Sequence, residues 1–287
     1  MVDTGLDIPT PAPARGAQRT KRIRPATLGL QSLAVVYIGL LVVVPVIVIF
    51  YRTFQPGIHV FWSALETPES VHAFEMTGIV ALCAVVINTV LGVAIALLLA
   101  RYRFWGRGLL NAFVDLPVAV SPIVVGLALI LVYGPTGWFG PFLERHGVVM
   151  IGAKPGMIIA TAFVSLPLVV RVLVPVLEQF GTDQEQAAAT LGASAIVRLR
   201  RITLPTVRIA LTYGIVLSLA RCIGEYGAVL VVSNNIEGST ETAPLRVGNL
   251  VENSLDYNSA YAITFVLMMV SFLAILLGAY IRRRIRI

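Results

Sequence analysis

Six apolar stretches, each long enough to cross a bilayer, divide the sequence. They run approximately over residues 30–51, 77–100, 110–133, 156–177, 207–232 and 260–281. A membrane-spanning helix needs about 20 mostly apolar residues. The pattern therefore predicts an all-α integral membrane protein with six transmembrane helices.

Composition excludes the other broad classes of protein. Apolar residues make up 57% of the chain, mean hydropathy is +0.86, and only 13% of residues are charged, against about 25% in soluble domains. The net charge of +7 does not indicate nucleic acid, because the arginines cluster beside apolar spans and not on a polar, aromatic-rich surface. We expect these arginines to lie at the surface of the lipid bilayer, which is the partner that the composition predicts.

Arginine placement predicts the topology. The N-terminal tail, the loop between the second and third spans, the loop between the fourth and fifth, and the C-terminus are rich in arginine, whereas the alternate loops are not. By the positive-inside rule, both termini and the loop at 182–205 face the cytoplasm. The predicted parts are a disordered basic tail (1–28), a first helix with an external loop (29–70), a five-helix core (71–281) and a basic C-terminal tail (282–287).

Several prolines lie inside the predicted spans, where each removes a backbone hydrogen bond. Pro45, Pro167 and Pro175 predict kinks or breaks, although for Pro45 the general abundance of proline in membrane helices is explanation enough. The third span differs, since Asp115, Pro117, Ser121 and Pro122 occur together there. We expect a functional break at this point, because broken helices in a membrane line cavities or pack against protein.

The loop between the fourth and fifth spans is polar and alanine-rich. Thr182 and Glu185 fit a capping box, which predicts a short helix from Asp183 to about Leu191, and Gly192 is placed to end it in a left-handed conformation. A second helical piece, about 194–201, should follow before Pro205 begins the fifth span. Two interpretations fit the first helix: a docking knob whose alanines permit close approach, or an amphipathic helix lying among lipid headgroups.

The spacing of this loop favours the docking knob. Gln186-Ala187-Ala188, three residues, Gly192, nine residues and Ile202-x-Leu204-Pro205 resemble the EAA loop of ABC importer permeases. The resemblance implies a type I ABC importer permease of MetI-like architecture, in which this loop is the coupling helix that fits a groove on an ATPase subunit. The coupling residues that it implies are Glu185, Gln186, Ala187, Ala188, Gly192, Ile202, Leu204 and Pro205.

One position departs from that motif. Gln186 stands where the family has glutamate, and Glu185 directly precedes it. Either Glu185 supplies the acidic contact or the contact with the ATPase is weaker in this chain.

The chain is not expected to be an enzyme. A phosphate-binding loop needs a Gly-Lys-Ser/Thr step, but the only two lysines, Lys21 and Lys154, follow Thr20 and Ala153. We therefore expect this chain to bind no cofactor or metal, and ATP with Mg²⁺ to be used by separate ATPase subunits.

Two further stretches narrow the resemblance. Residues 115–134 and 220–247 resemble sulfate/thiosulfate permeases of the CysW type, and the likeness extends over most of residues 30–280. It implies a bacterial inner-membrane complex of this chain with a second, T-type permease, a dimer of ABC ATPase subunits and an extracytoplasmic sulfate-binding protein.

Other functions stay open at this point. The chain could be the T-type partner, or a permease for molybdate or another oxyanion. A secondary anion transporter would need an ion-coupling acid cluster and internal repeats, and neither is clear. A membrane enzyme would need reactive groups within reach of one another, whereas His59, His72 and His146 are scattered over loops predicted to be external.

Ionisable residues inside spans are candidate functional groups. Arg221 and Glu225 are four residues apart, share a helix face and can pair. Arg221 could line the sulfate path with Glu225 orienting it, but an internal pair that fixes helix packing is favoured, since a neutral pair suits burial. Arg171 either snorkels or faces the partner, and Asp115 caps or pairs nearby.

Sulfate is a strongly hydrated dianion, and a fixed countercharge would hold it too tightly for transit. Backbone amides at helix breaks and side-chain hydroxyls are weaker donors. The hydroxyls considered for the path are Ser121, Thr161, Ser165 and Ser218. Each could instead satisfy its own helix. Cys83 and Cys222 are expected to be buried packing residues.

Overall fold

The computed structural model describes residues 25–285, with side chains described from residue 33 to residue 283. Every regular element of the described residues is a helix. Its elements are α1 (Pro25–Phe54), α2 (Ile58–Leu65), α3 (Pro68–Arg101), α4 (Arg107–Ala119), α5 (Pro122–Tyr133), α6 (Gly140–Arg145), α7 (Lys154–Phe180), α8 (Asp183–Thr190), α9 (Ala195–Arg198), a π-helix (Leu199–Thr203), α10 (Leu204–Ile223), α11 (Gly227–Val232), α12 (Ala243–Glu252) and α13 (Tyr257–Ile285). Of the predicted tails, residues 1–24 and 286–287 fall outside this range, whereas residues 25–28 belong to α1 and residues 282–285 to α13.

Two units make up the chain, and the division lies within α1, between Val48 and Ile49. In the first unit, nearly every described side chain from Leu33 to Val48 is exposed and most are large and apolar. A helix that is apolar all round is typical of a membrane span.

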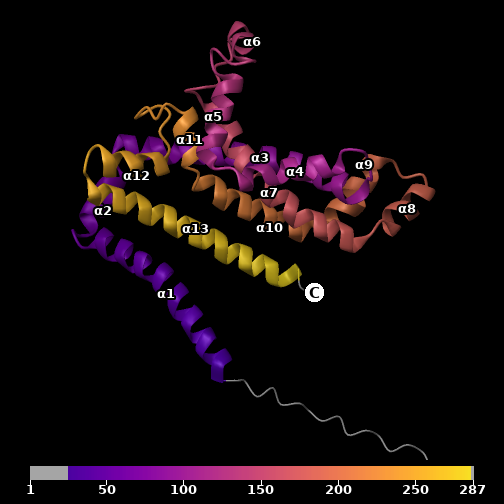
Figure 1. Cartoon of the computed structure of the whole chain (residues 1–287), viewed down its shortest axis with the longest axis horizontal. Helices are drawn as coiled ribbons and strands as arrows, with labels where there is room; N and C mark the ends of the chain where they lie inside the picture. The colour runs from indigo at the N-terminus through magenta and orange to yellow at the C-terminus, as the bar shows by residue number, and fades with distance from the viewer. Residues whose placement is uncertain (1–24, 286–287) are drawn as a thin grey trace, which may run out of the picture. The chain divides into compact units, whose positions relative to one another are not determined.

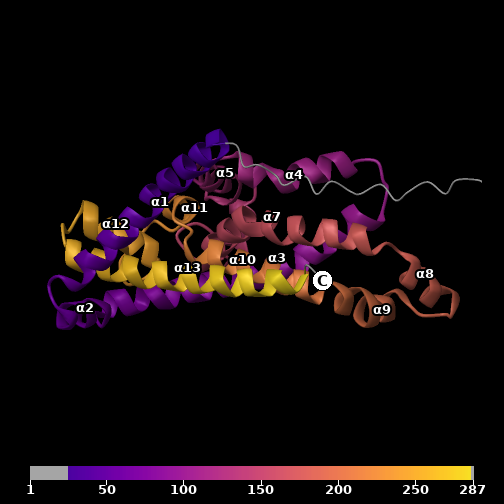
Figure 2. The same cartoon turned by 90° about the horizontal axis from the view of Figure 1, so that it is seen from below.

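The second unit is built around α7, which packs against α3 and α10, while α13 runs along α10. Figure 1 shows α8 and α9 at one end of this bundle and α2 and α12 at the other. We call these the α8 end and the α12 end. Figure 2 shows α4 running along α7, and in Figure 1 α5 and α6 project from the side of the bundle.

The predicted number of six spans is reached when α4 and α5, which are bent against each other, are counted as one span. Within residues 25–285, five helical segments are long and apolar enough to cross a membrane, and α4 with α5 would be the sixth. The third span was predicted as one segment, 110–133, but α4 and α5 meet at an angle of 116°. The break itself was predicted from the prolines. Pro122 forces the preceding residue, Ser121, into an extended conformation with ψ 136°, which ends α4.

The fifth span was predicted to run to Val232, and this is wrong. α10 ends at Ile223, Gly224 is its C-cap, and α11 is a separate short helix. In contrast, α7 continues through Pro167 and Pro175 without a break.

A glycine sets the spacing between α3 and α7. A Cβ built on Gly92 would lie 2.7 Å from Cγ1 of Val169, whose side chain is fully buried. Gly214 of α10 approaches the backbone of the same valine. Small residues at such crossings let membrane helices pack closely, and Val169 therefore sits where three helices meet.

We expect Gly92→Ala to destabilise the bundle by about 2 kcal/mol, because the stiff β-branched Val169 cannot yield to the added methyl group. The thermal unfolding midpoint in detergent should fall by about 5 °C. Gly78 is the matched control, since it lies on the same helix with nothing within 4 Å of a built Cβ. Equal midpoints for Gly92→Ala and Gly78→Ala would contradict the tight crossing.

Candidate functional site

The loop at the α8 end has the predicted helix–glycine–helix form. α8 spans Asp183–Thr190, and Gly192 has a φ of +83°. The Gly192 amide donates to the carbonyl of Ala189, and the Ala193 amide to that of Ala188. This pair of bonds is a Schellman motif, which favours glycine at the left-handed position. The second piece was predicted as a separate helix over about 194–201, but α9 (Ala195–Arg198) continues without a gap through the π-helix into α10.

A cluster of hydrogen bonds between Glu185, Arg101 and Thr203, which we call the knot, anchors α8 to the membrane helices. Glu185 Oε1 accepts hydrogen bonds from Arg101 Nη2 at 3.1 Å and from Thr203 Oγ1 at 2.9 Å. Arg101, the last residue of α3, also donates to the carbonyl of Leu177 near the end of α7, at 2.8 Å. One carboxylate thus joins α8 to α3 and to the π-helix before α10, and through Arg101 to α7.

The knot overturns the predicted capping box. Glu185 points to Arg101 and not back to Thr182, whose side chain makes no capping bond to the backbone. Thr182 Oγ1 instead accepts from Nε2 of Gln186, at 2.9 Å. The charge on Arg101 explains the difference, because a charge-assisted bond is stronger than a bond to a neutral amide. Sequence reasoning counted Arg101 only toward topology and missed Thr203.

The outer face of the loop is exposed and partly apolar. Gln186, Ala187 and Ala189 are exposed, and Leu191 and Ile196 are 88% and 66% accessible. Pro205 is exposed, Ile202 and Leu204 are half-buried, and Ala188 is half-buried. Exposed apolar side chains on a polar loop are typical of a contact surface.

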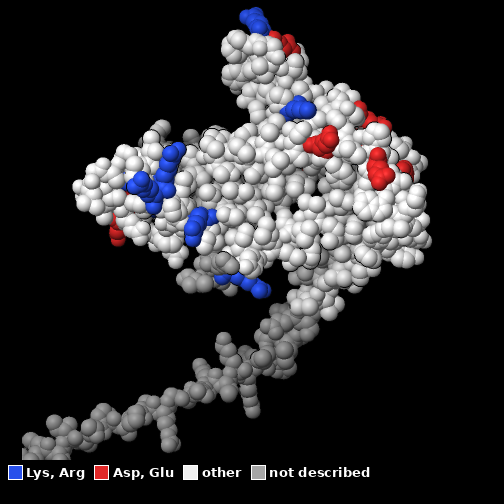
Figure 3. All heavy atoms as spheres, turned by 180° about the vertical axis from the view of Figure 1, so that it is seen from behind, with Lys and Arg blue, Asp and Glu red and all other residues white. Residues whose placement is uncertain are grey.

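Charge is distributed unevenly between the two ends of the bundle. On the face drawn in Figure 3, lysine and arginine atoms gather at the α8 end and aspartate and glutamate atoms toward the opposite end. The arginines at the α8 end include Arg101, Arg103, Arg107, Arg198, Arg200, Arg201 and Arg208. The asymmetry follows the arginine pattern of the sequence.

Two helix breaks lie against each other where α5 meets α11. A Cβ on Gly126 of α5 would lie 2.9 Å from the Ala228 carbonyl oxygen, and one on Gly227 of α11 would lie 3.2 Å from Cβ of Pro122. α5 and α11 therefore cross in near contact. Ser121 is exposed at the first break, and Glu225 lies in the second, so the structure brings these two predicted path residues to neighbouring breaks.

The predicted pairing of Arg221 with Glu225 is confirmed, with Nη1 of Arg221 2.7 Å from Oε2 of Glu225. Glu225 is not on the fifth span, however, because it follows the end of α10. Its Oε1 accepts from the Ala228 amide at 2.9 Å, which caps α11. The Glu225 side chain is 2% exposed, whereas that of Arg221 is 38% exposed. Only the arginine is accessible from outside.

Three of the hydroxyls considered for the path are enclosed and do not line an accessible surface. Thr161, Ser165 and Ser218 are buried where α3, α7 and α10 meet. Asn88 Nδ2 donates to Ser165 Oγ at 2.7 Å and to Ser218 Oγ at 3.3 Å. Sequence reasoning missed Asn88, although an amide inside an apolar span was a sufficient signal. Such a cluster fixes helix packing, and the path interpretation therefore keeps Ser121 and Arg221.

The cysteines differ from each other. Cys222 is buried beside Ser165, with the two side-chain heteroatoms 3.1 Å apart, as expected of a packing residue. Cys83 is exposed on α3, so the prediction of burial is wrong for that residue.

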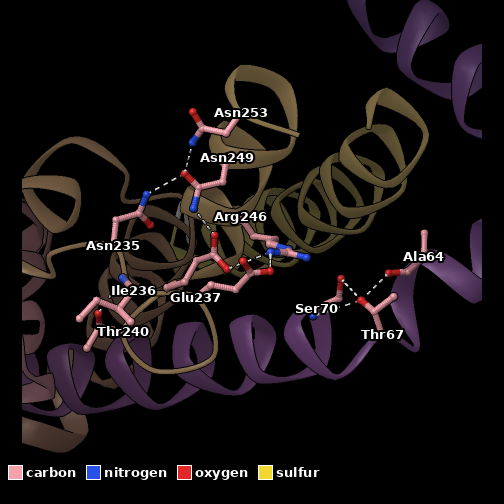
Figure 4. A network of polar contacts seen from close by, with 11 residues as sticks. Ala64, Thr67, Ser70, Asn235, Ile236, Glu237, Thr240, Arg246, Asn249 and Asn253 are labelled. Atoms are coloured by element: carbon pink, nitrogen blue, oxygen red, sulfur yellow. Dashed lines mark hydrogen bonds and ion pairs between the residues drawn. The ribbon is translucent and has the colours of Figure 1, made fainter. Parts of the chain in front are cut away.

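At the α12 end, polar side chains of α12 and of the loop that precedes it bond to one another and hold that loop in place (Figure 4). Asn249 Nδ2 donates to the buried Glu241 carboxylate at 2.5 Å, and Asn235 Nδ2 donates to Asn249 Oδ1 at 2.9 Å. Arg246 pairs with Glu237 and lies 3.5 Å from Glu241. Asn235 has a φ of +48°, a conformation that asparagine tolerates better than most residues. The network fixes the shape of this loop.

Glu241 should make this loop sensitive to pH. Burial raises the pKa of its carboxyl group, while the bond from Asn249 and the charge of Arg246 oppose the rise. A raised folded pKa means that the native state holds the proton more tightly. The contribution to stability is therefore full below the ordinary pKa of about 4.3 and declines as pH rises toward the raised value.

We expect Glu241→Gln to remove this decline. The thermal midpoint of the unmodified protein should fall relative to that of the variant between pH 4 and the raised pKa. A midpoint that rises relative to the variant over the same interval would contradict the direction.

Comparison with known proteins shows the family to which this chain belongs. Residues 88–287 match the family described as binding-protein-dependent transport system inner membrane component. The chain is 38% identical to a sulfate transport system permease protein CysW of Synechococcus elongatus, covering 95% of this chain and 96% of that one. It is 44% identical to the Escherichia coli K12 protein of that name, over 79% of each chain. Identity to a CysT permease of Salmonella typhimurium is 35%, over 90% of this chain and 92% of that one.

A solved structure agrees in fold. The structure of a bacterial ABC transporter involved in alginate import matches with a TM-score of 0.74 at 17% identity, covering 91% of this chain and 96% of that one. A match at 17% identity shows only that the two folds are similar. Together, these findings place the chain in the binding-protein-dependent transport system inner membrane component family, as a multi-pass ABC importer permease related to the CysW type.

Proposed function

We propose that this chain is one of two permease subunits of an ATP-driven importer that moves sulfate into the cytoplasm. The observation that carries the proposal is the identity of 38% and 44% to two CysW sulfate permeases over most of the chain. Thiosulfate is a second expected substrate, because it is a tetrahedral dianion of the same class. The second permease would be of the T type, since the chain also aligns with a CysT permease.

In this proposal, the ATPase dimer docks on the exposed face of α8 and α9 and supplies the site for ATP and Mg²⁺. The knot around Glu185 would then transmit the movement of the ATPase to α3, α7 and α10 together. Glu185 is already bonded within the chain, so the exposed Gln186 is the residue left to face the ATPase at the motif position.

The orientation follows from charge. The arginine-rich α8 end would face the cytoplasm of a bacterial cell, with both termini on the same side. The α12 end, with its polar loop, would face an extracytoplasmic sulfate-binding protein. Arg221 and Ser121, at the two helix breaks, would contact the anion, with Glu225 holding the arginine in place.

The test is ATP-dependent sulfate uptake in proteoliposomes that contain this chain, its second permease, the ATPase and the binding protein. We expect uptake only with ATP and with all four components, and competition by thiosulfate. Uptake by this chain alone would instead indicate a secondary transporter. Strong competition by molybdate with little uptake of sulfate would indicate a permease for another oxyanion.

A further inference from the structure

A second arginine–acid pair lies on the face formed by α4 and α7. Arg171 of α7 donates from Nε to Asp115 Oδ1 at 2.7 Å, and its Nη2 lies 2.5 Å from Asp115 Oδ2. Nη1 donates to the side-chain oxygen of Asn111 at 2.9 Å, and Nη2 to its main-chain oxygen at 3.3 Å. The guanidinium is therefore clamped in one orientation against α4.

This patch lies at membrane depth. Arg171 is nine residues before Phe180, where α7 ends, and Asp115 is eight residues after Arg107, where α4 begins. At 1.5 Å per residue, both are about 12–14 Å from the α8 end. Half of the hydrocarbon core is about 15 Å thick, so with the helix ends at the edge of the apolar region the pair would lie within one leaflet.

The pair is nevertheless accessible. The Arg171 side chain is 39% exposed and that of Asp115 is 53% exposed. Charged side chains at this depth almost always face protein or a water-filled cavity, because exposure to lipid is costly. A lipid-facing position is thus the least favourable assignment for this face.

The bonds that hold the Arg171 guanidinium leave some N–H groups free to donate to an anion, while Asp115 balances the positive charge. A guanidinium has five N–H groups, and the four bonds above use four of them. Within the described residues, one N–H of Nη1 and the amide group of Asn111 have no acceptor. Asp115 balances the positive charge, so a dianion would meet hydrogen-bond donors and only a weak net field, which suits brief residence.

We infer that Asn111, Asp115 and Arg171 form a transient anion-binding site in the cytoplasmic half of the translocation path, with a tetrahedral oxyanion as its ligand. The inference rests on the proposed function. The Arg221–Glu225 pair is also an accessible arginine balanced by an acid, although its acid is 2% exposed whereas Asp115 is 53% exposed. In this scheme it is the counterpart in the outer half. Asp115 is a positioning residue in this scheme, whereas Arg171 and Asn111 touch the anion.

Two variants in the complete complex give the first test. Arg171→Gln should lower the initial rate of sulfate uptake at least tenfold, with assembly unchanged and ATP hydrolysis within twofold of normal. Arg107→Gln is the matched control, because Arg107 pairs with Glu178 between the same two helices at their exposed α8 ends, at 3.3 Å. Its uptake should stay within twofold of normal. Equal uptake by the two variants would overturn the inference.

Accessibility gives a second test that does not depend on the folding of the arginine variant. Asn111→Cys is placed in a background with Cys83→Ser and Cys222→Ser. An anionic methanethiosulfonate added from the cytoplasmic side should label it, and millimolar sulfate should slow labelling at least threefold. An unreactive cysteine, labelling that sulfate does not slow, or cross-linking of this cysteine to the second permease would overturn the inference. Failure of the proposed function looks different, because the unmodified complex would then take up no sulfate.

Discussion

Glu185→Ala is expected to reduce ATP-driven uptake by the complete complex at least tenfold. The substitution removes the carboxylate of the knot, so that Arg101 keeps only its bond to the Leu177 carbonyl and Thr203 only its bond to the Arg198 carbonyl. Hydrogen bonds to a charged group contribute about 2 kcal/mol each when the pair is partly shielded from water. The Arg101 and Glu185 side chains are only 10% and 19% exposed. α8 should still form, but it would no longer be fixed to α3 and the π-helix.

The measurement is uptake per ATP hydrolysed. Loss of the anchor should lower this ratio, since the ATPase would close without moving the membrane helices. Asp183→Asn is the control, because Asp183 is exposed in the first turn of the same helix and should change the ratio by less than twofold. Arg101→Ala should reproduce the effect of Glu185→Ala, and the double variant should be no worse than either single variant. Additive losses would show that the two residues act separately.

Glu225→Gln is expected to reduce uptake at least tenfold and to destabilise the protein. The carboxylate is buried, and its loss leaves the partly exposed Arg221 without its countercharge. Breaking a fully buried pair costs about 3–5 kcal/mol, and the partial exposure of Arg221 lowers this to about 2 kcal/mol. Glutamine can still accept from the Ala228 amide, so the cap of α11 should survive.

A double variant separates packing from transport. Arg221→Gln with Glu225→Gln removes both charges and should recover most of the lost thermal midpoint, because no unpaired charge remains. Uptake should stay low if Arg221 contacts the anion. Recovery of uptake together with stability would assign the pair to helix packing alone, which the sequence favoured.

The sequence predicted the spans well where a long apolar run decides them and poorly where a break does. Six runs were visible, but the end of α10 at Ile223 was not, because the residues of α11 are as apolar as those of a continuing span. In the third span, Pro122 removes a backbone donor and restricts Ser121, so the break there could be predicted locally. The loop at 182–205 was also local, since Gly192 and its neighbours form the turn from their own backbone bonds.

By itself, the sequence determined the membrane class, the helix–glycine–helix loop and the arginine asymmetry, because each depends on composition or on residues close together in the chain. Only the tertiary structure decided which partner each polar group takes. Glu185 turned to Arg101 and not to Thr182, Ser165 and Ser218 were enclosed around Asn88, and Arg171 met Asp115. The physical reason is that a buried polar group takes the best donor or acceptor within reach, and helix packing alone determines which groups are within reach.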